Sequence, residues 1–439
     1  MSNVPQVQVG IMHEPSVEFV LHGNYKVNGI EVTGNQTATM QDGKVCWNGS
    51  VCEEFFFEPT DAENDSFELI GVTIGVNFHW ERKENQTFRG ALRLIVEHGA
   101  LCPVNVLSVE EYLLSVISSE MSATASLELL KAHAVISRSW LLAQMDKSKK
   151  LAAGATKYCA CTQTEDELVK WYDREDHFNF DVCADDHCQR YQGITRASTQ
   201  KVRDAIKATW GEVLTYDGEL CDARFSKSCG GVYEEFENCW EPKHYDYLVA
   251  RLDGADEMNF PDLTVEENAR EWILNAPEAY CNTTDKKILS QVLNNYDQET
   301  TDFYRWKVEY TQDELSKLVK ERSGVDYGKI LDLEPIARGT SGRLYRLKIV
   351  GDKKTQIIGK ELEIRRTLSP SHLYSSAFVV EKQDVDADGV PQKFIIRGAG
   401  WGHGVGLCQI GAAVMGEKGY NYKEILLHYF INADINKLY

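Results

Sequence analysis

The chain has 439 residues, of which 43% are hydrophobic and 26% are charged, so it has the composition of a globular protein and enough length for more than one domain. Its 67 acidic and 47 basic side chains give a formal net charge of −20. This acidic balance argues against nucleic acid as a partner and against a polybasic membrane anchor.

Residues 1–14 lack the basic start and the apolar stretch of a signal peptide, and no apolar run reaches the roughly 18 residues of a membrane span. Residues 1–105 are predicted to form a β-rich N-terminal region. Short strand-like runs such as residues 17–21 and 92–96 alternate there with turn signals such as Gln41-Asp42-Gly43.

The pattern becomes helical at Ser108, which forms a capping box with Glu111 and precedes apolar residues at helical spacing. This helix is predicted to stop near Glu120, and a second helix is predicted over about residues 126–145. Strand-like segments return after residue 303, and the chain closes with a helix near residues 422–430. The fold class is therefore predicted to be α+β, with strand-rich lobes around a central helical pair.

Residues 106–439 are predicted to form a second region after the β-rich one, interrupted by a polar, partly helical insertion at about residues 252–300. Glu120 lies at the junction of the two predicted helices. A carboxylate beside an apolar helix face can be partly desolvated, which raises its pKa toward the range of a general acid. Taken alone, such a glutamate is more often a solvated helix-end residue.

Two imidazoles and two thiols fall within twelve residues in His177, Cys183, His187 and Cys188. These donors suit tetrahedral Zn²⁺, although the spacing is not that of a standard zinc finger and other cysteines and aspartates compete nearby. The alternative is a set of buried cysteines and surface histidines.

Cys229 precedes two glycines, so it is either a nucleophile paired with His133 or His403 or part of a structural turn. The chain has twelve cysteines. In an oxidising compartment, disulfides could form between Cys229 and Cys239 and between Cys46 and Cys52. Buried free thiols are the more common arrangement in a protein of this size.

Residues 397–406 carry a glycine at every second position. If this run is extended, one face of the strand has no side chains, while Trp401 and His403 point the other way. A bare strand face lets a flat ligand or another backbone approach closely. The alternative is a tight packing contact.

These motifs occur together and in order in the SpoIID/LytB family, which the chain resembles. The resemblance covers about residues 100–250 and 303–420, and it rests on four segments, namely residues 107–121, 130–140, 228–231 and 400–412. Similar spacing also covers residues 341–343 and 373–378. The family usually has Pro where this chain has Ser122 and Tyr where it has Trp140.

The resemblance implies a SpoIID-like catalytic cleft with Glu120 as the catalytic acid/base. Members of the SpoIID type are lytic transglycosylases that cleave denuded peptidoglycan glycan strands and leave 1,6-anhydro-muramic products. It also implies a closed, structural zinc site with no organic cofactor, and its ligands are His177, Cys183, His187 and Cys188. Substrate contacts are predicted for Arg138, Ser228, Cys229, Gly230, Trp401, His403 and Gln409.

Two other functions remain open. LytB-like members are non-catalytic enhancers that stimulate a separate N-acetylmuramoyl-L-alanine amidase of the cell wall. A cysteine-dependent hydrolase using Cys229 would instead need a paired histidine. Peptidoglycan as substrate implies the cell envelope, the periplasm or the cell wall, as the location of the protein.

Overall fold

The computed structural model describes residues 4–75, 81–122, 124–153, 161–171, 177–185, 188–195, 199–255, 259–292 and 302–439. The chain divides into two compact units. The first contains residues 1–154, 176–222 and 435–439, and the second contains residues 155–175 and 223–434.

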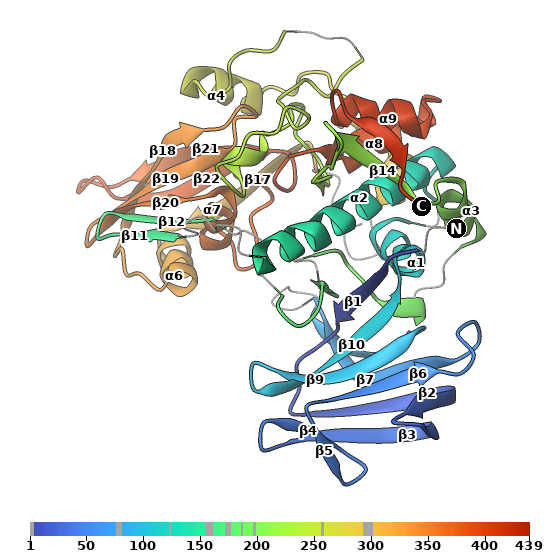
Figure 1. Cartoon of the computed structure of the whole chain (residues 1–439). Coiled ribbons are helices and arrows are strands. Elements are labelled where there is room, and N and C mark those ends of the chain that lie inside the picture. The colour runs from blue at the N-terminus through green and yellow to red at the C-terminus, as the bar shows by residue number, and fades with distance from the viewer. Residues whose placement is uncertain are drawn as a thin grey trace. The chain divides into compact units, whose positions relative to one another are not determined.

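A large, mostly antiparallel sheet forms much of the first unit (Figure 1). Its strands are β1 (Gln6–Gly10), β2 (Ser16–Val27), β3 (Ile30–Gln41), β4 (Lys44–Trp47), β5 (Ser50–Cys52), β6 (Glu54–Pro59), β7 (Ser66–Ile74), β8 (Arg82–Phe88), β9 (Ala91–Glu97), β10 (Ala100–Ser108) and β13 (Val182–Cys183). The strand order is β13-β1-β10-β9-β6-β2-β3-β4-β5, with β7 paired to β2 and β8 paired to β7. Side chains alternate across the pleat. In β6, for example, Phe55 and Phe57 are buried and Phe56 is exposed.

The predicted helical pair is present in the first unit as α1 (Val109–Glu120) and α2 (Leu127–Ala152). The Ser108 hydroxyl caps α1 by accepting a hydrogen bond of 3.2 Å from the amide of Glu111. The helix ends at Glu120, as predicted, whereas α2 continues beyond the predicted residue 145. The unit also contains the 3₁₀ turn η1 (Gly193–Thr195), α3 (Gln200–Ala208), β14 (Glu212–Tyr216) and β15 (Glu219–Leu220), and the C-terminal strand β24 (Asp434–Lys437) pairs with β14.

The second unit contains two further sheets (Figure 1). One has the order β11 (Cys161–Gln163), β12 (Glu167–Lys170), β20 (Thr355–Gly359), β19 (Leu344–Gly351) and β18 (Ile330–Arg338). The other has the order β17 (Arg305–Thr311), β22 (Pro391–Ala399) and β21 (Phe378–Val385). Two short segments, β16 (Phe225–Ser226) and β23 (Leu407–Cys408), pair in parallel. That pairing brings the segment before Cys229 beside the end of the glycine-rich run.

The helices of the second unit are α4 (Glu266–Leu274), α5 (Lys286–Val292), α6 (Gln312–Ser323), α7 (Glu361–Thr367), α8 (Gln409–Glu417) and α9 (Tyr422–Tyr429), with the 3₁₀ turn η2 (Phe236–Asn238). Both ends of α6 follow from local sequence. Thr311 and Glu314 form a capping box, and Gly324 ends the helix with a φ of 74°. Leu315 of α6 and Ile364 of α7 pack in one apolar cluster with Leu347 of β19.

The α+β class is confirmed, because helices and sheets occur in both units. The region predicted as a polar insertion carries α4 and α5. Among the helices of the described ranges, none combines the length and the apolar character needed to cross a membrane.

Candidate functional site

Glu120, the predicted catalytic residue, is the last residue of α1 and is half-buried. Its Oε1 accepts a hydrogen bond of 3.2 Å from the backbone amide of Arg190. Both residues belong to the first unit. One oxygen of the carboxylate is therefore held by a backbone donor.

The segment that supplies this donor also contacts α1 at two other points. The amide of Gln192 donates to the hydroxyl of Ser115 at 3.0 Å, and the hydroxyl of Tyr112 donates to Oε1 of Gln189 at 3.3 Å. Tyr112, Ser115 and Gln189 are buried. Residues 189–192 therefore contact α1 at Tyr112, Ser115 and Glu120 and fix the position of its C-terminal part.

The predicted zinc ligands immediately precede this segment. His177, Cys183 and Cys188 have donor atoms that all lie within 4.8 Å of one another, and Nε2 of His177 is 3.5 Å from Sγ of Cys188. The corresponding N–S edge of a tetrahedral zinc site is about 3.6 Å, from metal–ligand bonds of about 2.1 and 2.3 Å. The donors therefore fit a metal ion. The fourth predicted ligand, His187, lies outside the described residues.

The sheet holds one end of this group. Cys183 ends β13, which pairs in parallel with β1 through Val9 opposite Val182 and Gly10 opposite Cys183. The amide of Cys188 donates to the carbonyl of Asp185 at 3.0 Å. In the first unit, β1 thus holds Cys183 through strand pairing, and Cys188 directly precedes the segment that contacts Glu120.

Arg138 of α2, predicted to contact substrate, has no exposed surface and makes a bidentate ion pair with Glu110 of α1 at 2.7 and 2.8 Å. Its third hydrogen bond goes to the carbonyl of Glu212 at 2.9 Å. Glu110 also accepts from the hydroxyl of Tyr439 at 2.6 Å. This geometry makes Arg138 a positioning residue that joins the two helices of the pair.

The glycine-rich run lies in the second unit and does not form the bare-faced strand considered from the sequence. β22 ends at Ala399, and Gly400, Gly402, Gly404 and Gly406 all have positive φ values between 71° and 96°. This left-handed conformation is readily accessible only to glycine, so every second residue turns the chain and prevents an extended strand. The alternative, a tight packing contact, is the one present.

Arg343 is the side chain against which the run packs, and it was not singled out as a site residue from the sequence. It is buried, and its guanidinium donates to the carbonyl oxygens of Cys229 at 2.9 Å and Gly402 at 3.1 Å. A Cβ placed on Gly404 would lie 2.5 Å from that guanidinium. One arginine thus holds together two segments that the sequence separates widely. Its signal in the sequence was its place in the motif at residues 341–343.

Trp401 and His403 remain partly accessible. The ring of Trp401 packs against Tyr374 at 4.3 Å and Phe303 at 4.7 Å between centroids, which leaves it in an aromatic cluster of the kind that can stack on a sugar. Burial and the nearby Arg224 hold the pKa of His403 well below its ordinary range. Nδ1 of this neutral ring accepts from the amide of Val405 at 3.0 Å.

The other predicted contact residues of the second unit are enclosed. Ser228 pairs with Trp401 through two backbone hydrogen bonds of 2.8 and 3.0 Å, and its hydroxyl is buried without a hydrogen-bond partner among the described residues. Gly230 has a φ of 80°, and a Cβ there would lie 2.9 Å from the amide of Gly400. Gln409 is buried at the start of α8.

The thiol of Cys229 contacts Asp253 and Cys281. It lies 3.6 Å from the thiol of Cys281, and burial raises its pKa well above the usual value, which disfavours a nucleophilic thiolate. His403 uses Nδ1 for the amide of Val405. The geometry therefore does not favour a cysteine-dependent hydrolase.

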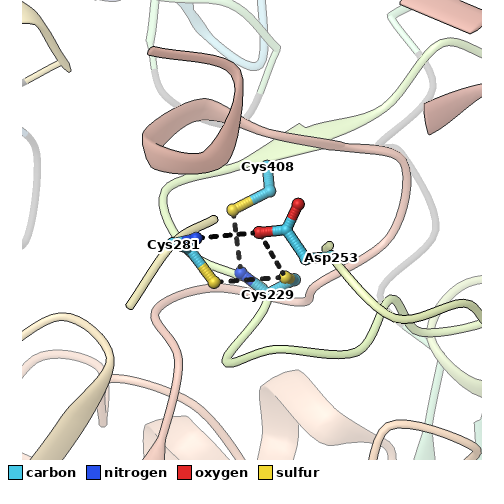
Figure 2. Close-up of side chains that lie close together, drawn as sticks. All are labelled: Cys229, Asp253, Cys281 and Cys408. Carbon is cyan, nitrogen blue, oxygen red and sulfur yellow. Dashed lines mark hydrogen bonds between the residues drawn. The ribbon is translucent and has the colours of Figure 1, made fainter. Parts of the chain in front are cut away.

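The cysteines of the described residues are free thiols, so neither Cys46 with Cys52 nor Cys229 with Cys239 forms a disulfide. The thiol of Cys239 is directed at the carbonyl of His403, 3.9 Å away. Cys229 instead belongs to a buried group with Asp253, Cys281 and Cys408, shown in Figure 2, which sequence spacing did not indicate.

Comparison with known proteins identifies two segments of the chain. A family model described as Stage II sporulation protein matches residues 97–216, and one described as a domain of unknown function matches residues 234–406. The first match includes α1, α2 and the segment that contacts Glu120. Apart from residues 155–175, the matched range lies in the first unit.

Relatives match over longer stretches. An uncharacterized protein of Brachyspira hyodysenteriae is 26% identical over 79% of this chain and 72% of its own length. An amidase enhancer of Bacillus subtilis is 27% identical over 72% of this chain, although that match spans only 39% of the enhancer. Stage II sporulation protein D of Bacillus amyloliquefaciens is 22% identical over 76% of each chain. These matches confirm the resemblance described from the motifs.

Proposed function

We propose, because this chain belongs to the SpoIID/LytB family, that it acts on the cell wall as a peptidoglycan lytic transglycosylase with Glu120 as its acid/base. The substrate class is the denuded glycan strand, and the product carries a 1,6-anhydro-muramic ring. This substrate lies outside the cytoplasmic membrane, so the proposed location is the cell envelope.

The observation that carries the proposal is the placement of the Glu120 carboxylate. It stands at the end of α1, half-buried, with Oε1 held by the amide of Arg190 at 3.2 Å. A catalytic acid must keep its geometry within a fraction of an ångström, and backbone donors on a packed segment provide that rigidity. The family match over residues 97–216 includes both partners.

A single carboxyl group suffices for the chemistry. Glu120 in its acid form gives a proton to the glycosidic oxygen as the bond between that oxygen and the anomeric carbon breaks. The 6-hydroxyl of the same muramic residue then attacks the anomeric carbon, and its proton passes to the Glu120 carboxylate. The acid form is restored, one bond is broken and one is formed, and no water is consumed.

The predicted metal site has a positioning role in this proposal. His177, Cys183 and Cys188, with His187 as the fourth ligand, would hold a zinc ion with all four positions filled by protein, which makes the site structural. The thiols fix the segment that leads to Arg190, and Arg190 in turn orients Glu120. In the second unit, the half-buried ring of Trp401 keeps its predicted role as a contact for a sugar ring.

Digestion of purified denuded glycan strands tests the proposal, with products read by mass spectrometry. Wild type should release anhydro-muramic products, and Glu120→Gln should release none. Glu111→Gln, at the opposite end of α1, is the matched control and should cleave like wild type. Equal cleavage by Glu120→Gln and wild type would reject Glu120 as the acid. If none of the three proteins cleaves the strands, the proposed transglycosylase activity is rejected.

The second candidate function is a non-catalytic amidase enhancer, favoured by the relative of that name. An enhancer binds and stimulates an N-acetylmuramoyl-L-alanine amidase, and its activity does not need the Glu120 carboxylate. Adding wild type or Glu120→Gln to a purified cell-wall amidase distinguishes the two functions. Equal stimulation by both proteins, without anhydro products, would support the enhancer.

A further inference from the structure

Four buried side chains from distant parts of the second unit meet in one group. Cys229 follows β16, Asp253 and Cys281 lie on either side of α4, and Cys408 ends β23. Each has an exposed fraction of at most 2%. In Figure 2 the sulfur atoms and the carboxylate are turned toward one another. The function proposed above uses none of these side chains.

The spacing of the donor atoms matches a tetrahedral metal site. The thiols of Cys229 and Cys281 are 3.6 Å apart, and Sγ of Cys229 is 3.6 Å from Oδ2 of Asp253. Metal–sulfur bonds of about 2.3 Å and metal–oxygen bonds of about 2.1 Å place the S–S edge of a zinc tetrahedron at about 3.8 Å and the S–O edge at about 3.6 Å. All four donor atoms, including Sγ of Cys408, lie within 4.8 Å of one another.

The surroundings orient the carboxylate toward the sulfur atoms. Oδ1 of Asp253 accepts hydrogen bonds from the hydroxyls of Tyr429 at 3.0 Å and Tyr233 at 3.4 Å. Oδ2 faces the thiol of Cys229 and also accepts from the amide of Cys281 at 3.1 Å. Such outer partners are a regular feature of ligating carboxylates. Backbone bonds from Asp253 to Gly231, at 2.8 Å, and from Tyr280 to Asp253, at 2.6 Å, fix the three loops together.

A hydrogen bond to the fourth donor gives the same indication. The amide of Cys229 donates to Sγ of Cys408 at 3.3 Å, an arrangement that favours a thiolate at Cys408. A divalent cation between the three sulfur atoms and the carboxylate would compensate the charge of the deprotonated donors in this buried space.

We propose that Cys229, Asp253, Cys281 and Cys408 bind a zinc ion in a closed, structural site of three sulfur atoms and one oxygen. With four protein ligands the site has no open position for substrate or water. It fastens the segment around α4 to the turn at Cys229 and to the end of the glycine-rich run. The site is separate from the His177 group, which belongs to the first unit.

Metal analysis of the full chain tests this site directly. The background is a Cys183→Ser/Cys188→Ser variant, which removes the contribution of the His177 group. In that background the protein should retain about one zinc ion per chain, and Cys281→Ser should lose it. Cys239→Ser is the matched control, because Cys239 is also buried, and its thiol is directed at the carbonyl of His403 and is not one of the four donors. Equal zinc in the Cys281→Ser and Cys239→Ser proteins would overturn the proposal.

A second measurement needs no variant and remains informative if Cys281→Ser fails to fold. Native wild type is alkylated with and without a zinc chelator, and peptides containing Cys229, Cys281 and Cys408 are quantified by mass spectrometry. Protection of all three thiols that is lost on chelation supports the site. A Cys229–Cys281 disulfide, or thiols whose protection the chelator does not change, would overturn it.

Discussion

The backbone amide of Arg190 donates a hydrogen bond of 3.2 Å to Oε1 of Glu120, and Arg190 is two residues from Cys188, a predicted metal ligand. This relationship links the geometry of the proposed acid to the predicted metal site, which takes no part in the proposed chemistry. A loss of metal is therefore expected to act on catalysis through position.

The first prediction concerns that coupling. Cys188→Ser should lose about one zinc ion per chain and lower the rate of glycan cleavage by about 10- to 100-fold, because the segment that holds Glu120 is no longer fixed. The measurements are metal content and anhydro-product formation on the same preparations. Cys46→Ser, outside the metal groups, is the control and should change neither. Full activity in a zinc-depleted Cys188→Ser protein would show that the metal site does not position Glu120.

The second prediction concerns the buried ion pair between Glu110 and Arg138. Arg138→Met should lower the free energy of unfolding by about 3–5 kcal/mol, because the Glu110 carboxylate stays buried without its partner. Urea denaturation measures the effect. Lys150→Met is the matched control, since Lys150 pairs with Asp146 and Glu219 at the surface and its loss should change stability little. Similar losses in both variants would contradict the structural role of Arg138.

The third prediction compares two glycines with the same backbone conformation. Gly404 has a φ of 79° and Gly389 a φ of 80°, but a Cβ on Gly404 meets the Arg343 guanidinium at 2.5 Å whereas a Cβ on Gly389 meets nothing within 4 Å. Both alanine variants bear the left-handed penalty of about 1 kcal/mol. Gly404→Ala should lose about 1–3 kcal/mol more, because Arg343 must move. Equal unfolding midpoints would show that the run does not pack tightly on Arg343.

The fourth prediction concerns pH. Burial lowers the pKa of Lys360 to about 8, with Nζ 3.6 Å from the ring centroid of Trp171. Between about pH 8 and the unfolded value of 10.5 the unfolded chain binds more protons than the folded chain at this position, so the contribution of Lys360 to stability rises with pH. The melting temperature of wild type should therefore rise relative to that of Lys360→Met between about pH 8 and 10.5, and the difference between the two proteins should not change below pH 8. Parallel melting-temperature profiles of the two proteins would contradict the lowered pKa.

Local signals in the sequence were sufficient for several elements. The cap at Ser108, the apolar spacing after it and the end of the helix at Glu120 are all set within a few residues, and α1 has these bounds. The α+β class and the helical pair followed from the same kind of signal, as did the clustering of His177 with Cys183 and Cys188, which are close in sequence. The family resemblance rested on motifs that are themselves short and contiguous.

The tertiary structure alone decided which distant residues meet. Cys229, Cys281 and Cys408 are far apart in sequence, and no periodicity or spacing connects them, so only the folded loops and the pairing of β16 with β23 could place their sulfur atoms in one group. The role of Arg343 is of the same kind. The glycine-rich run shows most clearly what the sequence could not predict, because glycine permits both an extended and a left-handed backbone. Packing against Arg343 selected between them, and such packing is a property of the fold and not of a local segment.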